Sequence, residues 1–432
     1  MKKIFLILLI SILFNQNAFA FTLYEALLQA YLNNPELNAE RENIKVSKED
    51  HNISKSEFLP TVTVSGSKSE ESTSKITDSA GANSSIADVN PTTQSIEIEQ
   101  KLFQGFAGVA SLQKSKIGLD LAQAKLLKIE QEILYKAIEA YSGLVFANEK
   151  LKINQRNVSL LEQQVETDQA RLERGQITLA DLAQSESSFA GAQAKFIQAK
   201  NEMVTAKLEY EKIIGIITNV DDLSKTPNFN FEIPNNLNDA IEISKNTNPD
   251  LIIAKLDYEQ SEKDVVIAKA EFSPSASISL KSSKTDDSSS TYDEIDKEIA
   301  KATISWPIFK GGKNKATLNR SENLKNRKKL LFDNALRTNN TNVASAWSIL
   351  QSSKSLLNSV TLQVRAAEIA NEGITVEYES GLGRSTLDVI QSNSLLLSSK
   401  ISLAESERNY LLSQFKLLQA IGNLKNDYLK LQ

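Results

Sequence analysis

Hydrophobic residues follow two different periods along this chain, and each period predicts one kind of element. Apolar and polar residues alternate one by one in four short segments, at residues 61–65, 96–99, 275–280 and 300–306. Such an alternation predicts a β-strand with one apolar and one polar face. Polar stretches separate the segments within each pair, so we expect two strand hairpins with long polar loops, at about 61–102 and 275–306.

Apolar residues recur every seven positions in longer segments. Two of these segments carry the series Ala137, Leu144, Leu151, Val158, Val165 and Leu172, and the series Val343, Leu350, Leu357 and Val364. A sustained seven-residue repeat predicts a coiled-coil helix, and residues 109–173 alone correspond to about 98 Å of helix at 1.5 Å per residue. Glycine-containing turns end these helices, and a returning helix follows each turn. We therefore expect two long helical hairpins, at about 106–214 and about 313–422.

The two halves of the chain repeat one another. Corresponding residues are 214 positions apart at first, then 206 and finally 207, as in the pairs Asn34 and Asn248, Pro60 and Pro274, Phe103 and Phe309, and Asp181 and Asp388. The order and spacing of these matches indicate an internal duplication. We expect a first repeat at 21–214, a linker at 215–236, a second repeat at 237–423 and a C-terminal tail at 424–432. The predicted fold class is mainly α with membrane β, built from a duplicated αββα-type repeat in which short helices come first.

The first twenty residues have the order of a secretory signal peptide. Lys2 and Lys3 precede an apolar run at residues 4–14, and small residues follow up to Ala20. A retained membrane anchor is the less favoured alternative, because a membrane-spanning helix needs about 20 apolar residues. We expect cleavage after Ala20, and we expect any entry of the mature chain into a bilayer to use its strands.

Composition and charge exclude several classes of function. The chain has no cysteine and one histidine, His51, so thiolate metal sites, cysteine nucleophiles and multi-histidine metal sites are impossible. The formal net charge of -5 gives no sign of the basic surface that nucleic-acid binding requires. The glycines at 311–312 lack the rest of a phosphate-binding loop, and those at 381–383 lack the third glycine of a dinucleotide fingerprint. We expect no enzyme activity, no catalytic residue, no cofactor and no dedicated metal site.

Four strands do not form a complete membrane structure. An open sheet would leave unpaired edges in lipid, and bacterial outer-membrane barrels have at least about eight strands. Three copies of four strands would supply about twelve, an even number within the range of such barrels. The pattern therefore predicts a homotrimer with a shared transmembrane β-barrel and a long antiparallel coiled-coil α-barrel.

This order of elements resembles the TolC family of trimeric outer-membrane channels over residues 21–423. The most specific local signs are the Asn-Pro-Glu/Asp-Leu motifs at 34–37 and 248–251, the segment 307–312 and the hairpin segment 378–388. The resemblance implies the exit duct of a tripartite efflux pump or type I secretion system in the outer membrane of a Gram-negative bacterium. Such a duct extends into the periplasm, conducts substrates passively and opens by movement of the coiled coils at its periplasmic tip.

The resemblance also implies partners. A periplasmic adaptor and an inner-membrane transporter of the ABC, RND or MFS class would supply the substrate, and outer-membrane lipid would surround the barrel. Whether drugs or proteins are exported is not distinguished by the sequence. A periplasmic adaptor or coiled-coil scaffold without a pore is the alternative function. Two helical hairpins and paired amphipathic strands disfavour it, because an adaptor would carry one hairpin inserted between β-domains.

Candidate gate residues follow from the same resemblance. Tyr378 and Arg384 correspond to latch residues, Asp181 to a partner acid, and Asp388 to the constriction. Gln391 stands where the family often has a second acid, and the turn before Arg384 is one residue longer than usual. Simpler alternatives are seam packing for Tyr378, solvation for Arg384 and a favourable helix dipole for the two aspartates.

Trp306 is a separate candidate site. It directly precedes Pro307 at the end of the last alternating segment. Tryptophan is enriched at membrane–water interfaces, so we expect either an interface anchor or a residue that packs on the strands.

Overall fold

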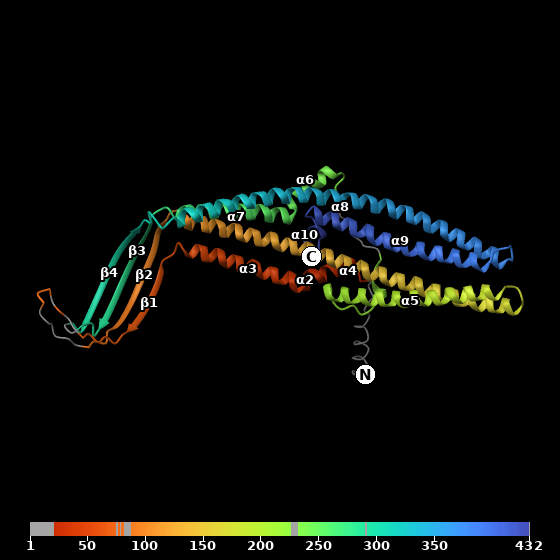
Figure 1. The fold of residues 1–432 in the computed structure, drawn as a ribbon, viewed down its shortest axis with the longest axis horizontal. Helices are drawn as coiled ribbons and strands as arrows, with labels where there is room; N and C mark the ends of the chain where they lie inside the picture. The colour runs from red at the N-terminus through yellow and green to blue at the C-terminus, as the bar shows by residue number, and fades with distance from the viewer. Residues whose placement is uncertain are drawn as a thin grey trace, which may run out of the picture. The chain divides into compact units, whose positions relative to one another are not determined.

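A computed structural model describes residues 21–74, 77, 79–81, 88–225, 232–289 and 292–431. The expected signal peptide, residues 1–20, lies outside the described residues, as do parts of the polar loops and residues 226–231 of the expected linker. Figure 1 shows the order of the elements along the chain. Among the described residues, no helix is both long enough and apolar enough to cross a membrane.

The internal duplication predicted from the sequence is present in the elements themselves. The first repeat contains α2 (Leu23–Asn33), α3 (Pro35–Ser56), β1 (Thr61–Lys68), β2 (Thr92–Gln104), α4 (Ala107–Glu173) and α5 (Leu179–Ile213). The second contains α6 (Leu237–Thr247), α7 (Pro249–Ala270), β3 (Ser275–Asp286), β4 (Glu294–Ser305), α8 (Lys313–Glu379) and α9 (Thr386–Ala420). Equivalent helices have equal lengths of 11, 22, 67 and 35 residues in the two repeats.

The Asn-Pro motifs explain how two of these helices begin. The Asn34 side-chain oxygen accepts hydrogen bonds from the backbone N–H groups of Glu36 and Leu37, at 3.0 and 3.3 Å. The Asn248 oxygen caps α7 in the same way. Proline at the first helical position lacks an N–H that would otherwise need a partner, so both short helices end and both following helices start at a defined residue.

The chain packs as two compact units, and α4 and α8 contribute to both. One unit consists of Glu42–Ala124 and Ile252–Ala335, and the other of the remaining described segments. We call the first the strand unit and the second the hairpin unit.

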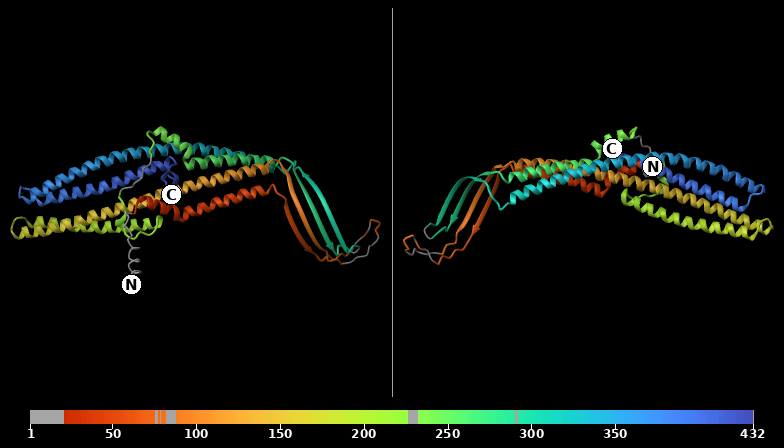
Figure 2. Two further views of the ribbon diagram at one scale, coloured as in Figure 1. Left: turned by 180° about the vertical axis from the view of Figure 1, so that it is seen from behind. Right: turned by 45° about the horizontal axis from the view of Figure 1, so that its top comes forward.

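The strand unit contains a four-stranded antiparallel sheet in the order β1-β2-β3-β4 (Figures 1 and 2). Residues paired across neighbouring strands point to the same face of a sheet. One row is apolar and consists of Val62, Ile98, Leu280 and Ala300. The adjacent row on the other face consists of Thr63, Glu97, Lys281 and Ile299, and Glu97 and Lys281 form an ion pair at 3.9 Å. The first face stays apolar only near the helices, because beyond Val64 and Ile96 it carries Ser282, Lys284 and Glu298. The sheet therefore has one largely polar face and, on the other face, an apolar band at the end nearest the helices. Its outer strands, β1 and β4, each leave one edge unpaired within the described residues.

The hairpin unit holds the main hydrophobic core. Fully buried side chains from α2, α4, α8 and α9 meet there, among them Leu27, Leu134, Leu144, Val343 and Phe415. The expected C-terminal tail also takes part, because it forms α10 (Asn426–Leu429) and buries Leu424, Leu429 and Leu431.

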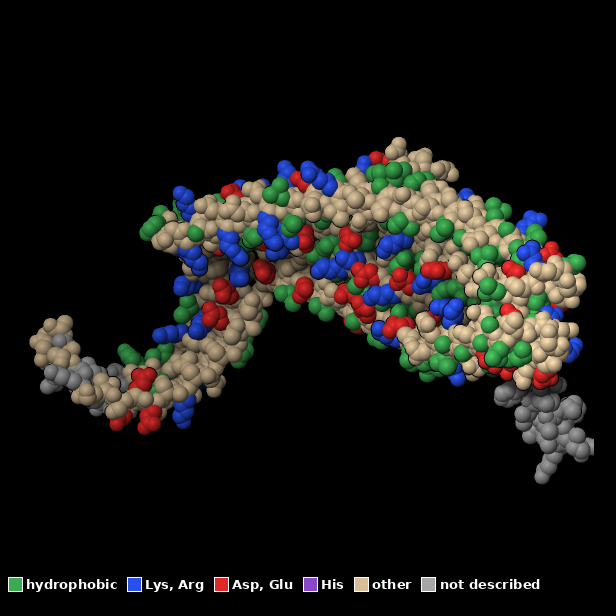
Figure 3. Space-filling view, turned by 45° about the vertical axis from the view of Figure 1, so that its right-hand side comes forward, with side chains coloured by type: hydrophobic (Ala, Val, Ile, Leu, Met, Phe, Trp, Pro, Cys, Tyr) green, Lys and Arg blue, Asp and Glu red, His purple; other side chains and the backbone are tan. Residues whose placement is uncertain are grey.

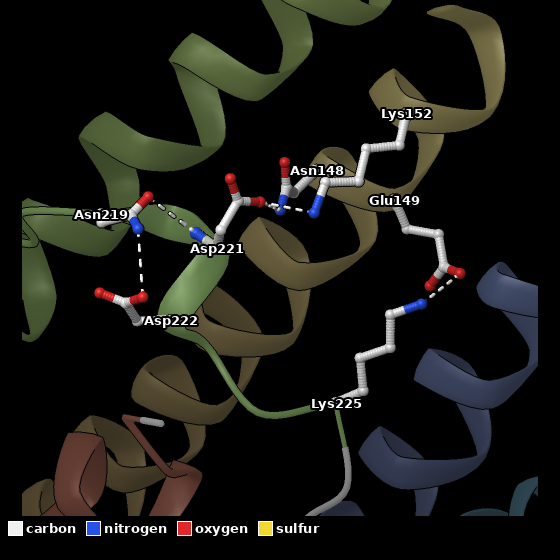
Figure 4. Close-up of polar contacts among 7 residues, drawn as sticks. All are labelled: Asn148, Glu149, Lys152, Asn219, Asp221, Asp222 and Lys225. Atoms are coloured by element: carbon white, nitrogen blue, oxygen red, sulfur yellow. Dashed lines mark hydrogen bonds and ion pairs between the residues drawn. The ribbon is translucent and has the colours of Figure 1, made fainter. Parts of the chain in front are cut away.

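The described part of the linker is held against α4 in the same unit. It forms the short helix η1 (Val220–Asp222), and Asp221 accepts hydrogen bonds from Asn148 at 3.1 Å and pairs with Lys152 at 2.5 Å (Figure 4). The ammonium group of Lys152 is the main reason that the pKa of Asp221 is lowered. Lys225 pairs with Glu149, which directly follows Asn148 on α4. These contacts fix the linker to the long helix.

Candidate functional site

The tips of the two helical hairpins carry most of the candidate gate residues. Both returning helices begin with the same capping box. Thr178 and Asp181 exchange hydrogen bonds at the start of α5, and Ser385 and Asp388 do so at the start of α9. In each box the carboxylate accepts from the cap residue's N–H at 2.9 Å.

These bonds perturb both aspartates. The pKa of Asp181 is lowered by the backbone and hydroxyl groups of Thr178. The pKa of Asp388 is lowered by the same groups of Ser385 and, to a smaller extent, by the charge of Arg384. Each carboxylate thus stabilises the first turn of its helix, which is the simpler role that the sequence allowed for these residues.

Tyr378 lies near the end of α8 and is only 7% exposed. Its hydroxyl donates a hydrogen bond to Oδ1 of Asp168 on α4, at 2.9 Å. The Gln164 amide donates to the Tyr378 oxygen at 3.2 Å, and the Thr386 hydroxyl lies 3.0 Å from it. The tyrosine therefore connects the second hairpin to the first.

Asp168 is the residue that sequence reasoning missed. It is completely buried, and its carboxylate has three donors within the protein. Besides Tyr378, the Gln164 amide donates to Oδ1 at 3.0 Å and the Ser185 hydroxyl donates to Oδ2 at 2.5 Å. A buried carboxylate is tolerated only when its oxygens are satisfied in this way.

One cation completes this arrangement. The guanidinium carbon of Arg171, one turn along α4 from Asp168, lies 4.2 Å from the centre of the Tyr378 ring. A guanidinium group above an aromatic ring is attracted by the ring's negative face. We call the whole group the Asp168 cluster, and it consists of Gln164, Asp168, Arg171, Ser185, Tyr378 and Thr386.

The structure brings the other predicted gate residues together only in part. Arg384 pairs with Glu377 of its own hairpin at 2.6 Å, and this carboxylate is the main reason that the pKa of Arg384 is raised. Gln391 is exposed on α9. Asp181 contacts its own turn, and the acid that Tyr378 contacts is Asp168.

Trp306 follows the end of β4 in the strand unit. The residue is 63% exposed, and its indole N–H donates to the carbonyl oxygen of Phe272 at 2.9 Å. An exposed ring with a satisfied N–H is compatible with an interface position, and the anchor role stays a prediction.

A family model described as "outer membrane efflux protein" matches residues 26–215 and 240–423, one segment in each repeat. The chain belongs to the outer membrane efflux protein family. Its resemblance to the TolC family is thereby confirmed, together with the outer-membrane location expected from the sequence.

Individual relatives agree over nearly the whole chain. The outer membrane efflux protein BepC of Brucella suis is 25% identical over 425 residues, which cover 98% of this chain and 90% of that protein. The outer membrane protein TolC of Escherichia coli is 23% identical, and the match covers 92% of this chain and 81% of that protein. Among solved structures, the CmeC outer membrane channel of Campylobacter jejuni is similar with a TM-score of 0.80 at 15% identity, covering 93% of this chain and 85% of that one. The predicted fold class is confirmed by this similarity.

Proposed function

We propose that three copies of this efflux protein form the exit duct of a tripartite efflux pump or type I secretion system. The observation that carries the proposal is the sheet, which has one largely polar face, an apolar band on the other face, and two edges that are unpaired within the described residues. Three such sheets joined edge to edge close a barrel with the apolar band toward lipid and the largely polar face toward a water-filled channel. A periplasmic adaptor and an inner-membrane transporter of the ABC, RND or MFS class deliver the substrate.

Planar-bilayer recording tests this function. The purified full-length mature protein, reconstituted from detergent, is expected to sediment as a trimer and to produce discrete conductance steps. A protein that remains monomeric in detergent, or a trimer that never conducts, would contradict the proposal. An adaptor or a coiled-coil scaffold would give no steps, so the same recording separates the two functions.

The hairpin tips form the gate in this proposal. The Asp168 cluster holds the two hairpins of one chain together, and Asp388, Gln391 and Arg384 lie near the opening. With three copies around one axis, three Asp388 carboxylates form a ring that attracts cations and repels anions.

This ring leads to a prediction about ionic block. Asp388→Asn is expected to weaken channel block by trivalent cations at least about tenfold, because three negative charges are removed from a narrow site. Since hydrogen bonds from Ser385 lower the pKa of Asp388, its charge is retained below the ordinary value of about 3.9. Block of the unmodified channel should therefore persist when the pH is reduced to about 5.

Asp181→Asn is the matched control for this experiment, because Asp181 occupies the same capping box in the first repeat. It should leave the blocking curve unchanged. Superimposable curves for Asp388→Asn and the unmodified channel would remove Asp388 from the constriction.

A further inference from the structure

Four basic residues follow the sheet of the strand unit, where its last strand leads into α8. They are Lys310, Lys313, Lys315 and Arg320, and we call them the basic cluster. All four are exposed, and no ion pair among the described residues involves any of them. Glu322 is the one acidic residue in the segment 306–330, so the surrounding chain does not neutralise the cluster. Unpaired like charges repel one another in a folded chain, which favours an anionic partner at this surface.

The equivalent residues of the first repeat are uncharged or already paired. At the offset of 206 residues, Lys310 corresponds to Gln104, Lys313 to Ala107, Lys315 to Val109 and Arg320 to Lys114. Lys114 forms an ion pair with Asp264 at 2.6 Å. Helices α4 and α8 nevertheless have the same length, so the fold of the repeat does not require the additional cations. The basic cluster therefore serves something other than the fold.

Large apolar side chains lie immediately before the basic cluster. Trp306, Ile308 and Phe309 are 63%, 86% and 84% exposed. Trp306 follows Ala302 and Ile304 at intervals of two residues, and these two belong to the same face of β4 as the apolar band. Figure 3 shows hydrophobic and basic side chains next to one another where the helices of this unit meet the sheet. One surface thus combines exposed apolar groups with unpaired cations.

Two hydrogen bonds hold the start of α8 beside Trp306. The indole N–H of Trp306 donates to the carbonyl oxygen of Phe272 at 2.9 Å, and the Asn314 amide donates to the preceding carbonyl, that of Glu271, at 2.7 Å. The lysines on either side of Asn314 therefore lie close to the tryptophan, at the end of the sheet that carries the apolar band. Tryptophan is enriched at the membrane–water interface, which is the depth of the lipid phosphates.

The length of the basic cluster fits one headgroup layer. The hydrocarbon core of a bilayer is about 30 Å thick and the whole bilayer about 40–45 Å, so each headgroup layer is about 5–8 Å deep. Measured along α8 from Lys313, Lys315 lies about 3 Å away and Arg320 about 10 Å away. The lysines thus lie within the depth of the headgroups. Arg320 lies within a Debye length of them, which is about 8 Å at physiological ionic strength.

We propose that the basic cluster binds the phosphate groups of anionic phospholipids in the leaflet that faces the periplasm, while Trp306, Ile308 and Phe309 contact the adjoining acyl chains. This inference rests on the membrane barrel proposed above and names the lipid that the barrel selects. A lysine near an anionic membrane surface raises affinity about fivefold. A zwitterionic phospholipid has no net charge and does not provide this gain, so the cluster distinguishes the two classes of lipid.

Fluorescence quenching by brominated lipids tests the proposal on the full-length mature protein in vesicles. The vesicles contain phosphatidylcholine mixed with phosphatidylglycerol, and one of the two lipids carries brominated acyl chains. Bromine quenches a nearby tryptophan, so the two series give the relative affinity of the two lipids beside Trp306. Trp306→Phe identifies this signal, because the other tryptophan, Trp347, packs against the core of the hairpin unit. We expect phosphatidylglycerol to bind at least about fivefold more tightly, and we expect high salt to reduce this preference.

Removing the lysine charges should abolish the preference for the anionic lipid. The variant with Lys310→Gln, Lys313→Gln and Lys315→Gln is expected to bind both lipids equally, within about twofold. Arginine at the same three positions keeps the charge and should keep the preference. The matched control combines Lys325→Gln, Arg327→Gln and Lys329→Gln. It removes the same charge about 18–24 Å from the start of α8 and should leave the preference unchanged.

The outcomes separate this inference from the function on which it rests. An unmodified protein that binds both lipids equally overturns the inference, and so does a glutamine variant that retains the preference. If neither lipid quenches Trp306, the segment lies away from the bilayer and the inference is again overturned. Discrete conductance steps from the same preparation would leave the proposed duct intact in each case, whereas a protein that forms no channel overturns the duct. If the triple glutamine variant gives no channel, the three single variants decide, because each should lose part of the preference.

Discussion

Replacing Asp168 by alanine is expected to open the hairpin tips of the proposed duct. The substitution removes the acceptor of the bond from Tyr378 and leaves the buried hydroxyl of Ser185 without its carboxylate. One hydrogen bond to a charged group contributes about 1.5–3 kcal/mol, which corresponds to a shift of about ten- to hundredfold between closed and open tips. We therefore expect a larger single-channel conductance and greater leakage of large antibiotics into cells that carry the variant.

Two further variants show whether this effect passes through Tyr378. Tyr378→Phe keeps the ring under Arg171 and removes only the hydroxyl. If both residues act through one bond, the double variant should conduct no more than Asp168→Ala alone, since coupled residues are not additive. Asp181→Ala alters the first-repeat tip without touching the cluster and should conduct like the unmodified protein. A correctly folded Asp168→Ala trimer with unchanged conductance would remove the cluster from the gate.

Gly422→Ala is expected to have the largest effect on the stability of the hairpin unit. Gly422 has a φ of +81° just after α9, and a Cβ placed there would lie 2.3 Å from both the carbonyl carbon and oxygen of Thr247. These are backbone atoms of the α6–α7 junction, where Asn248 also donates to the carbonyl of Ala420 at 2.8 Å. A left-handed backbone costs a non-glycine residue about 1–2 kcal/mol, and overpacking adds about 1–3 kcal/mol.

The matched control separates these two contributions. Gly383 has a φ of +84°, and a Cβ there would meet nothing within 4 Å. Gly383→Ala should therefore reduce the free energy of unfolding by the backbone contribution alone, whereas Gly422→Ala should reduce it by about twice as much or more. Thermal unfolding of the purified variants measures both. Equal losses in the free energy of unfolding would show that the backbone of the α6–α7 junction shifts to accommodate the added methyl group without cost.

The sequence predicted the secondary-structure elements better than it predicted the contacts between them. Residues 109–173 were expected to form a single helix, and α4 spans Ala107–Glu173, because a seven-residue repeat reports directly on helical packing. The repeat and the glycine turns also located both hairpins. The C-terminal tail was expected only as a tail, although its leucines enter the core. Four or five apolar residues without a period give no local signal for such docking.

Asp168 shows why the site was harder to predict. Ile133, Ala140, Ala147, Asn154, Leu161 and Asp168 form a second series with a spacing of seven on α4, and all six are buried. An acid in a seam position was a signal of a buried polar contact that the sequence analysis did not use. The family motif instead pointed to Asp181, which the structure places in a capping box. Which residue of α4 faces Tyr378 depends on the rotation of two helices about their axes, and no single-chain pattern specifies that rotation.

The unequal strands of the sheet have a consequence for the proposed barrel. β1 has eight residues, whereas β4 has twelve, so a β4 that meets the next copy's β1 leaves about four residues unmatched. β1 would then be short on both of its sides, once within its own copy and once between copies. Each contact between copies in the barrel would then involve the strand with the fewest paired residues. Separation of the strands under heat or tension would begin there, while the pairing among β2, β3 and β4 stayed intact.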